Sequence, residues 1–397
     1  MMDISAICEN VDWVGYVDWN MRDFHSFKTS RGVTYNSYLV RDDKTALIDT
    51  VKAPFAENLL ENISALIFKK SLDYIVVNHA ELDHSGSLAK VLERFPHATI
   101  LCDKKCKEIL SKLFNASNWK FQIIKSGDSV SLGENTLVFF ETPMLHWPES
   151  MFTYIPEKKL LFSMDAFGQH YSSSNRFDYA NDLNEIMGEA KKYYANIIML
   201  YGASVIKTME KISHLDIEII APSHGIIWRN YIKEILSSYR KWANFQAVGK
   251  VLVIYDSMWE STKIMGESIL SGAASQGIEG KLIHLRSTTL TEIASEVLDS
   301  PTIAFGSATL NMGMMPMMGA ALTYLKGLQP KNKFSFAFGS YGWGKGAPED
   351  IHEHLQSMKW NLIREPLKAL WKPNAQALDE CYEAGKKLGE IAKKFIS

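Results

Sequence analysis

The sequence lacks the features that mark several protein classes. Its 397 residues include only four cysteines, too few for a disulfide-stabilised scaffold, and Cys102 and Cys106 have no second pair with which to build a four-cysteine metal site. Basic and acidic residues nearly balance, 43 against 45, which argues against a binder of nucleic acid or anionic membrane. No apolar run approaches the ~18 residues of a membrane-spanning helix. No basic region followed by an apolar stretch opens the chain, so we expect no secretory signal and a cytoplasmic location.

The pattern of the chain changes near residue 249, and we expect two domains, residues 1–248 and 249–397. The first domain mixes short apolar β-type runs with helical patterns. Its longer predicted elements are a strand over 34–40 and helices over 54–70 and 183–215. In the second domain, beginning with the strand Lys250–Tyr255, apolar runs and helical patterns alternate. This alternation predicts a doubly wound parallel sheet, so the protein is of the α/β class.

One stretch of the first domain concentrates potential metal ligands. The apolar run Tyr74–Val77 predicts a buried strand, and His79, Glu81, Asp83 and His84 follow it directly. On an extended backbone the first three side chains would point to one side and His84 to the other. A loop after a strand is a common position for a functional site. The competing interpretation is a polar surface loop, which does not explain four ligand types within six positions.

Three further potential ligands occupy similar positions in the first domain. His146, Asp165 and His224 each follow a short predicted strand. With the stretch around His79 they provide four imidazoles and three carboxylates. A structural zinc site uses four ligands, often cysteines, whereas seven mixed nitrogen and oxygen ligands suit two first-row metal ions with a bridging carboxylate. Two adjacent metal ions can activate a small oxygen-containing substrate.

A second candidate site follows the strands of the second domain. The first strand ends in a hydroxyl-rich turn ahead of a helix, and a helix N-terminus with hydroxyls can bind phosphate. This turn contains neither Gly-x-Gly-x-x-Gly nor a Walker lysine, which disfavours dinucleotide and P-loop interpretations. Two later turns lie at the same edge of the predicted sheet, where ligands bind. The competing interpretation of the last turn is a glycine-rich turn with core aromatic residues. The candidate residues are Ser257, Met258, Trp259, Glu260, Ser261, Thr262, Ser307, Ala308, Thr309, Leu310, Asn311, Ser340, Tyr341, Gly342, Trp343 and Gly344.

Both patterns resemble known families. The stretch His79–His84 is similar to the His-x-His-x-Asp-His signature of metallo-β-lactamase-like proteins, with Glu81 in place of the second histidine. That replacement, with the spacing to the later ligands, resembles the flavodiiron proteins, and the hydroxyl-rich turn resembles flavodoxin. The resemblance implies an αββα metallo-β-lactamase-like sandwich followed by a flavodoxin-like domain, with FMN and two non-haem iron ions per chain. Because carboxylates are harder ligands than imidazoles, Glu81 favours iron over zinc.

The resemblance also implies roles for individual residues. The implied ligand sets are His79, Glu81 and His146 for one iron, Asp83, His84 and His224 for the other, and Asp165 as the bridge. In some family members the residue that matches His84 does not bind iron directly. His25 and Tyr194 are the implied catalytic candidates, because similarly placed residues reach the substrate pocket in the family.

The activity that the resemblance implies is reduction of O2 to water, of NO to N2O, or of both. Two ferrous ions and reduced FMN together hold the four electrons that O2 requires. The resemblance further implies a head-to-tail homodimer, possibly a tetramer, in which the FMN of one subunit lies beside the irons of its partner. Because the sequence contains no rubredoxin-type cysteine module, we expect a separate electron donor, either a rubredoxin-type protein or a reduced deazaflavin.

Two other functions stay open on the residues alone. A binuclear zinc hydrolase fused to a flavodoxin-like electron-transfer module would use the same positions, although Glu81 argues against zinc. A non-enzymatic electron carrier that uses only FMN would leave the seven ligands without a purpose. Metal content distinguishes the hydrolase, and the reaction of the reduced protein with O2 distinguishes the carrier.

Overall fold

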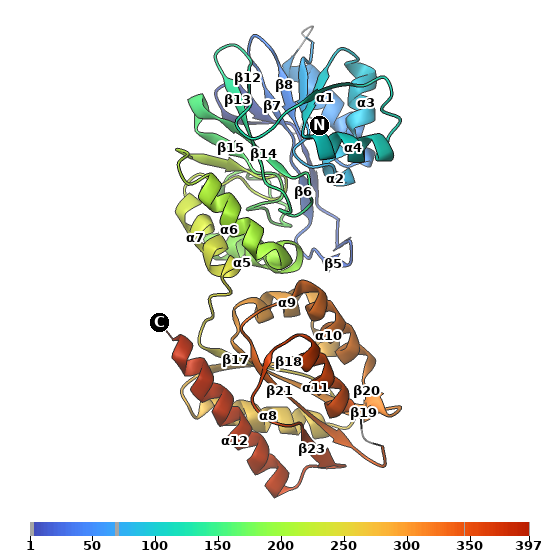
Figure 1. Cartoon of the computed structure of the whole chain (residues 1–397), viewed down its shortest axis with the longest axis vertical. Helices are drawn as coiled ribbons and strands as arrows, with labels where there is room; N and C mark the ends of the chain where they lie inside the picture. Colours follow the sequence, from blue (N-terminus) through green and yellow to red (C-terminus); the bar gives the residue numbers. More distant parts are fainter. Residues whose placement is uncertain (1–3, 68–70, 345, 397) are drawn as a thin grey trace. The chain divides into compact units, whose positions relative to one another are not determined.

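The computed structural model describes residues 4–67, 71–344 and 346–396. By its internal contacts the chain divides into two compact units, Met1–Arg240 and Lys241–Ser397 (Figure 1). The domain limits expected from the sequence, 1–248 and 249–397, stay a prediction. None of the helices in the described ranges combines the length and apolar character that crossing a bilayer requires.

The first unit contains two large β-sheets. In sheet order, the first consists of β1 (Ser5–Cys8), β2 (Val11–Trp13), β7 (Tyr38–Val40), β8 (Ala46–Ile48), β9 (Tyr74–Val76), β10 (Thr99–Cys102) and β11 (Lys120–Ile123). The second consists of β12 (Ser129–Ser131), β13 (Thr136–Glu141), β14 (Met151–Ile155), β15 (Leu160–Phe162) and β16 (Ile219–Ala221). Strands β8 to β11 run parallel to one another, and so do β15 and β16. Their carboxyl ends therefore gather at one edge of each sheet.

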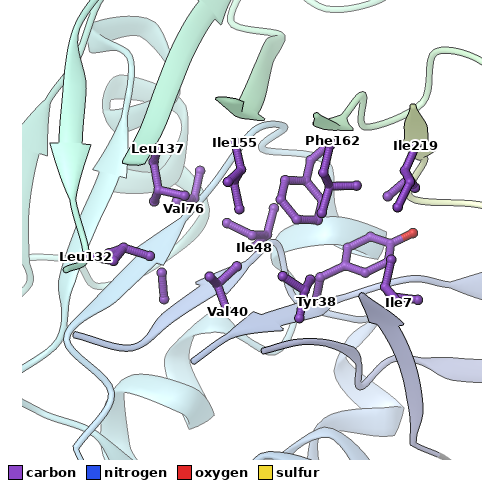
Figure 2. Close-up of a cluster of buried hydrophobic side chains, with 14 of the residues drawn as sticks. Ile7, Tyr38, Val40, Ile48, Val76, Leu132, Leu137, Ile155, Phe162 and Ile219 are labelled. Carbon is purple, nitrogen blue, oxygen red and sulfur yellow. The ribbon is translucent and has the colours of Figure 1, made fainter. Parts of the chain in front are cut away.

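A hydrophobic core lies between these two sheets (Figure 2). Val40 and Ile48 of the first sheet belong to the same buried cluster as Leu137 and Phe162 of the second. All four side chains are at most 1% exposed. Fully burying a side chain of this kind contributes about 1.5–3 kcal/mol. The cluster therefore holds the two sheets, and the strand ends they carry, in a fixed arrangement.

Helices cover the outer faces of this sandwich. The helices of this unit are α1 (Ala56–Leu66), α2 (Leu82–Ser85), α3 (Leu88–Arg94), α4 (Lys104–Leu113), α5 (Leu183–Tyr193), α6 (Gly202–Lys211) and α7 (Ile232–Ala243). A second buried cluster joins Leu59 of α1, Val91 of α3 and Leu110 of α4 to the first sheet. On the other side, Tyr239 of α7 packs on Phe167, which contacts β14. This order of layers confirms the predicted αββα sandwich. Residues 68–70 of the predicted helix 54–70 lie outside the described residues.

Two predicted elements are wrong in detail. The strand expected over 34–40 is interrupted, because β6 (Val33–Tyr35) pairs with β3 (Tyr16–Asp18), whereas β7 pairs in the large sheet. The side chain of Asn36, between them, donates to the carbonyl of Pro222 at 2.8 Å. The helix expected over 183–215 is α5 and α6 separated by a π-helical turn, Tyr194–Ile198, and a 3₁₀ turn. A short hairpin, β4 (Asp23–Phe24) and β5 (Phe27–Lys28), completes the unit.

The second unit is built on one largely parallel sheet. Its strands in sheet order are β18 (Glu279–His284), β17 (Lys250–Asp256), β19 (Thr302–Leu310), β21 (Phe334–Tyr341) and β22 (Asn361–Leu362), with β23 (Leu367–Leu370) also on β21 and β20 (Gly313–Met314) on β19. The helices are α8 (Ser261–Ala274), α9 (Leu290–Asp299), α10 (Pro316–Leu328), α11 (Ala347–Ser357) and α12 (Ala375–Ala392). One buried cluster joins α8 and α12 to the sheet, and another joins α9, α10 and α11 to it. The strand order and the two covered faces confirm the predicted doubly wound, flavodoxin-like sheet.

Glu296 of α9 links two strands of this sheet and predicts a pH-dependent stability. Its carboxylate contacts Lys250 at 3.0 Å and Lys281 at 2.8 Å. Burial would raise the pKa of Glu296, but these lysines outweigh it and lower the pKa from 4.5 to about 2. A lowered pKa stabilises the fold above about pH 4.5, and this contribution is lost as the pH falls towards 2. We expect Glu296→Gln to reduce the free energy of unfolding by about 1–2 kcal/mol at pH 7 and by less at pH 3.

Urea unfolding at both pH values measures this difference. Glu383→Gln is the control, because this exposed carboxylate contacts Lys386 only at 3.5 Å. If Glu296→Gln lowered the free energy of unfolding more at pH 3 than at pH 7, the lowered pKa of Glu296 would be contradicted.

Candidate metal centre and flavin site

His79 lies just beyond β9, and the residue before it fixes the loop. The backbone N–H and side-chain amide of Asn78 donate to Asp49 at 2.7 and 3.1 Å. Its side-chain oxygen accepts a hydrogen bond from Thr153 at 2.7 Å. Asp49 follows β8 and Thr153 lies in β14, and all these side chains are buried. Both sheets therefore hold the position of His79.

Asp83 and His84 do not continue the extended backbone that their alternating pattern predicts. Leu82–Ser85 forms the helical turn α2, in which the N–H groups of His84 and Ser85 donate to the carbonyl of Glu81 at 2.9 Å. A helical turn rotates successive side chains by about 100°. Asp83 and His84 therefore separate from Glu81 and join a different group of ligands.

The seven predicted ligands come together as two groups. We call His79, Glu81 and His146 the Glu81 group, and Asp83, His84 and His224 the Asp83 group. Within each group the ligand atoms lie within 4.8 Å of one another, and Asp165 also belongs with the Glu81 group.

Asp165, which follows β15, contacts both groups through different oxygens. Its Oδ2 lies 3.4 Å from Nε2 of His79 and 3.1 Å from Nε2 of His146. Its Oδ1 lies 3.1 Å from Nε2 of His84 and 3.4 Å from Nε2 of His224. One carboxylate oxygen therefore faces each group, which is the arrangement of a bridging ligand.

His224 depends on a glycine that follows it. Gly225 has a φ of +80°, and a Cβ there would lie 2.2 Å from the side-chain oxygen of Gln169. A side chain would thus be both strained and obstructed. The N–H of Gly225 donates to the hydroxyl of Thr34 at 2.7 Å, and Nδ1–H of His224 donates to the Thr34 carbonyl at 2.7 Å. These bonds leave Nε2 of His224 directed at Asp83 and Asp165.

Several atoms of this cluster show that it suits metal ions. Asp83 Oδ1, His84 Nε2 and Asp165 Oδ2 are buried and make no hydrogen bond of good geometry with the described residues. Buried polar atoms almost always have a partner. Each of these atoms belongs to the cluster of imidazole nitrogens and carboxylate oxygens, which are ligands that first-row metal ions accept. The residues therefore fit two metal ions that share Asp165.

The mutual contacts of these side chains set their pKa values. Burial alone would lower the pKa of His224, but hydrogen bonds to Asp165 and Asp83 outweigh it and raise the pKa to about 10. Burial would raise the pKa of Asp165, yet His84, His146 and His224 hold it well below its usual range. Metal ligation requires neutral imidazoles and ionised carboxylates. Protons and metal ions therefore compete for the same atoms.

The two predicted catalytic residues lie in different surroundings. His25, in the turn between β4 and β5, has its Nε2 3.6 Å from Glu81, and its side chain is 61% exposed. Tyr194 is fully buried and its ring packs on Tyr239. It is the neighbouring Tyr193 whose hydroxyl donates to Asp165 Oδ1 at 2.9 Å. Burial, and then Asp165, raise the pKa of Tyr193 well above its usual value, so this phenol stays protonated. The catalytic roles of His25 and Tyr194 stay predictions.

Sequence reasoning missed Glu149 and Thr34. Glu149 is fully buried, and its Oε1 accepts hydrogen bonds from Nδ1 of His79 at 2.8 Å and from the N–H of Ala80 at 3.0 Å. It lies between Pro148 and Ser150 in a loop without periodicity, so no local pattern marks it. Thr34 acts on His224 through its backbone carbonyl, which no sequence pattern identifies.

A cavity of about 850 Å³ opens at the carboxyl ends of β17, β19 and β21 in the second unit. This volume suits a medium-sized ligand. At one side α8 begins after Glu260, a residue in the left-handed conformation that gives the helix no side-chain cap. The first N–H groups of a helix lack intrahelical acceptors and attract anions. Trp259 and Trp343, which both line the cavity, are 88% and 90% exposed and give it apolar walls.

The cavity contains most of the residues expected to hold FMN. The predicted residues that line it are Met258, Trp259, Glu260, Ser261, Ala308, Thr309, Leu310, Asn311, Ser340, Tyr341, Gly342, Trp343 and Gly344. Ser257, Thr262 and Ser307 are buried and do not line the cavity, although the hydroxyl of Thr262 lies 3.1 Å from that of Ser340. Sequence reasoning missed Trp371 and Lys372, which also line the cavity and follow the unpredicted strand β23. The roles of these residues stay predictions.

Comparison with known proteins assigns each part of the chain to a family. The family model described as ODP family beta lactamase matches residues 33–225, and the flavodoxin model matches residues 253–385. A nitric oxide reductase from Moorella thermoacetica is 44% identical over 96% of this chain and 97% of its own length. An anaerobic nitric oxide reductase flavorubredoxin from Aeromonas hydrophila is 39% identical over 96% of this chain and 78% of its own length.

Solved structures of similar proteins cover nearly the whole chain. The flavodiiron protein from Giardia intestinalis has a TM-score of 0.95 and 38% identity, covering 99% of this chain and 97% of its own. The rubredoxin oxygen:oxidoreductase from Desulfovibrio gigas has a TM-score of 0.95 and 34% identity, covering 99% of both chains. These likenesses confirm the resemblance found in the sequence: the chain belongs to the flavodiiron protein family.

Proposed function

We propose that this protein reduces O2 to water, NO to N2O, or both, at two non-haem iron ions that receive electrons from FMN. The observation that carries this proposal is Asp165, whose two oxygens face the Glu81 group and the Asp83 group. Relatives named nitric oxide reductase and rubredoxin oxygen:oxidoreductase support the choice of substrates. The carboxylate of Glu81 supports iron over zinc, because carboxylates are harder ligands than imidazoles.

Each group of residues has a definite part in this proposal. The Glu81 group would hold one iron, the Asp83 group the other, and Asp165 would bridge them. Bound in this way, two ferrous ions and reduced FMN supply the four electrons that O2 needs, or the two that coupling of two NO molecules needs. Tyr193 keeps the bridging carboxylate oriented through its hydrogen bond of 2.9 Å. His25 is exposed to solvent beside Glu81, at the edge of the cluster.

FMN would occupy the cavity at the strand ends of the second unit. Its phosphate would lie at the N-terminus of α8, where Ser261 lines the cavity. The exposed rings of Trp259 and Trp343 would cover the flavin ring. The turns after β19 and β21 would contact it from the other sides. We propose that a separate protein of the rubredoxin type, or a reduced deazaflavin, delivers the electrons.

We also propose a head-to-tail homodimer, or a tetramer built from it, that places the FMN of one subunit beside the irons of its partner. The exposed tryptophans around the FMN cavity support a covered surface there. Full activity per chain at a dilution where light scattering shows only monomers would contradict this assembly.

Steady-state consumption of O2 and NO, measured side by side with each class of donor, tests the function. We expect consumption of at least one gas at about 1–1,000 turnovers per second, the usual range for enzymes. Consumption of O2 should release no peroxide, because four electrons are present on the protein. A reduced protein that stays reduced in the presence of both gases would contradict the proposal and favour a simple FMN electron carrier.

A further inference from the structure

Glu149 is a buried carboxylate outside the two ligand groups, and its two oxygens differ in their surroundings. Oε1 accepts hydrogen bonds from Nδ1 of His79 and from the N–H of Ala80. Oε2 is buried and makes no hydrogen bond of good geometry with the residues that the structure describes. Burying an ionised carboxylate with so few hydrogen-bond donors around it costs free energy unless a partner compensates its charge. Its charged contact is with the imidazole of His79.

This contact determines which nitrogen of His79 can bind a metal ion. A carboxylate only accepts hydrogen bonds, so Nδ1 of His79 carries the proton. Nε2 then has its lone pair directed at the cluster, 3.3 Å from Glu81 and 3.4 Å from Asp165. The ring is held further by Trp147, whose ring centroid lies 5.1 Å away at nearly a right angle.

The corresponding contact in the Asp83 group is different. Nδ1 of His224 donates at 2.7 Å to the carbonyl of Thr34, which carries no charge. Both histidines are therefore held in the same tautomer at similar distances, but only His79 has an anionic partner. An anionic partner makes an imidazole a more basic ligand, and a more basic ligand favours the more highly charged metal ion.

We propose that Glu149 is a positioning residue that strengthens the hold of the Glu81 group on its metal ion and lowers the reduction potential of that ion. This inference rests on the proposed two-iron site. It concerns the charge of Glu149 and not only its place in the fold, because a neutral acceptor could also tie the loop to Ala80.

Glu149→Gln separates the two roles, since glutamine keeps an acceptor oxygen but has no charge. We expect a chelator to remove one of the two iron ions per chain 10–100 times faster from this variant, the usual effect of changing a partner of a metal-bound histidine. The same 10–100-fold loss of affinity for the ferric ion raises its reduction potential by about 60–120 mV, at 59 mV per tenfold change for one electron. A redox titration of the mixed-valence electron paramagnetic resonance signal measures this shift. Glu141→Gln, the same change on β13, is the control and should leave both readouts unchanged.

Glu149→Asp keeps the charge and is the second variant, with expected values between those of the wild type and Glu149→Gln. Wild-type rates of iron loss and wild-type potentials in Glu149→Gln would overturn the proposal. Equal effects of Gln and Asp, or failure of both variants to fold, would show a purely structural role and overturn it too. A wild-type protein without iron would contradict the proposed function instead. In that case, the rates at which a chelator removes Co²⁺ from the wild type and from Glu149→Gln would still show whether Glu149 strengthens metal binding by His79.

Discussion

Replacing Asp165 with asparagine is expected to empty both metal positions. The two carboxylate oxygens each contact one group of ligands, at 3.1–3.4 Å. Asparagine keeps one oxygen and replaces the other with an NH2 group, which cannot bind a metal ion. Mutating a residue that only hydrogen-bonds to a metal ligand already costs about 10–100-fold in metal affinity or activity. Loss of a ligand shared by both metal ions should therefore lower the rate of gas consumption by at least about 100-fold.

The measurement is iron content by mass spectrometry together with the rate of O2 and NO consumption. We expect less than about one iron per chain in Asp165→Asn, while FMN content stays normal because the cavity proposed for FMN lies in the other unit. Asp216→Asn is the matched control, since this exposed aspartate contacts only Lys159 among the charged groups described for it. Retention of both irons with normal turnover would show that Asp165 is not the bridge.

Placing a carboxylate at Ser261 is expected to prevent FMN binding. Ser261 is the first residue of α8 and lines the cavity, where the backbone N–H groups would receive the phosphate. An aspartate there would face the phosphate dianion, and such like-charge contacts cost several kcal/mol. We expect the Kd of FMN to rise by at least about 100-fold, which corresponds to about 3 kcal/mol.

Fluorescence titration of FMN into the flavin-free protein measures this affinity. Ser271→Asp adds the same charge to the exposed side of the same helix, outside the cavity, and should bind FMN normally. Iron content should be unchanged in both variants. If Ser261→Asp binds FMN as tightly as the wild type, the phosphate does not lie at this helix end.

The positions of the ligands could be predicted from the sequence because the strands that carry them are short, apolar and distinct. His79, Asp165 and His224 each follow such a strand directly, and this repeated placement is why they were grouped as one ligand set. The turns after β17, β19 and β21 were recognisable for the same reason. The alternation of strands and helices also specified the doubly wound sheet of the second unit.

The parts that could not be predicted depend on contacts without a local pattern. Glu149 reaches His79 across 70 positions of sequence. Tyr193 and not its neighbour Tyr194 donates to Asp165, and nothing in the local sequence distinguishes the two tyrosines. The strand β23, whose end supplies Trp371 to the cavity, is only four residues long and half exposed. In each case the decisive partner lies far away in the sequence.

Metal analysis of the wild-type protein, purified without added metal, distinguishes a two-iron site from a zinc site. We expect about two iron ions and about one FMN per chain, because the seven predicted ligands form two groups that both contact Asp165. Mössbauer spectra should show the irons as a coupled pair. Zinc without iron at these positions would refute the two-iron site and favour a binuclear zinc hydrolase fused to a flavodoxin-like module.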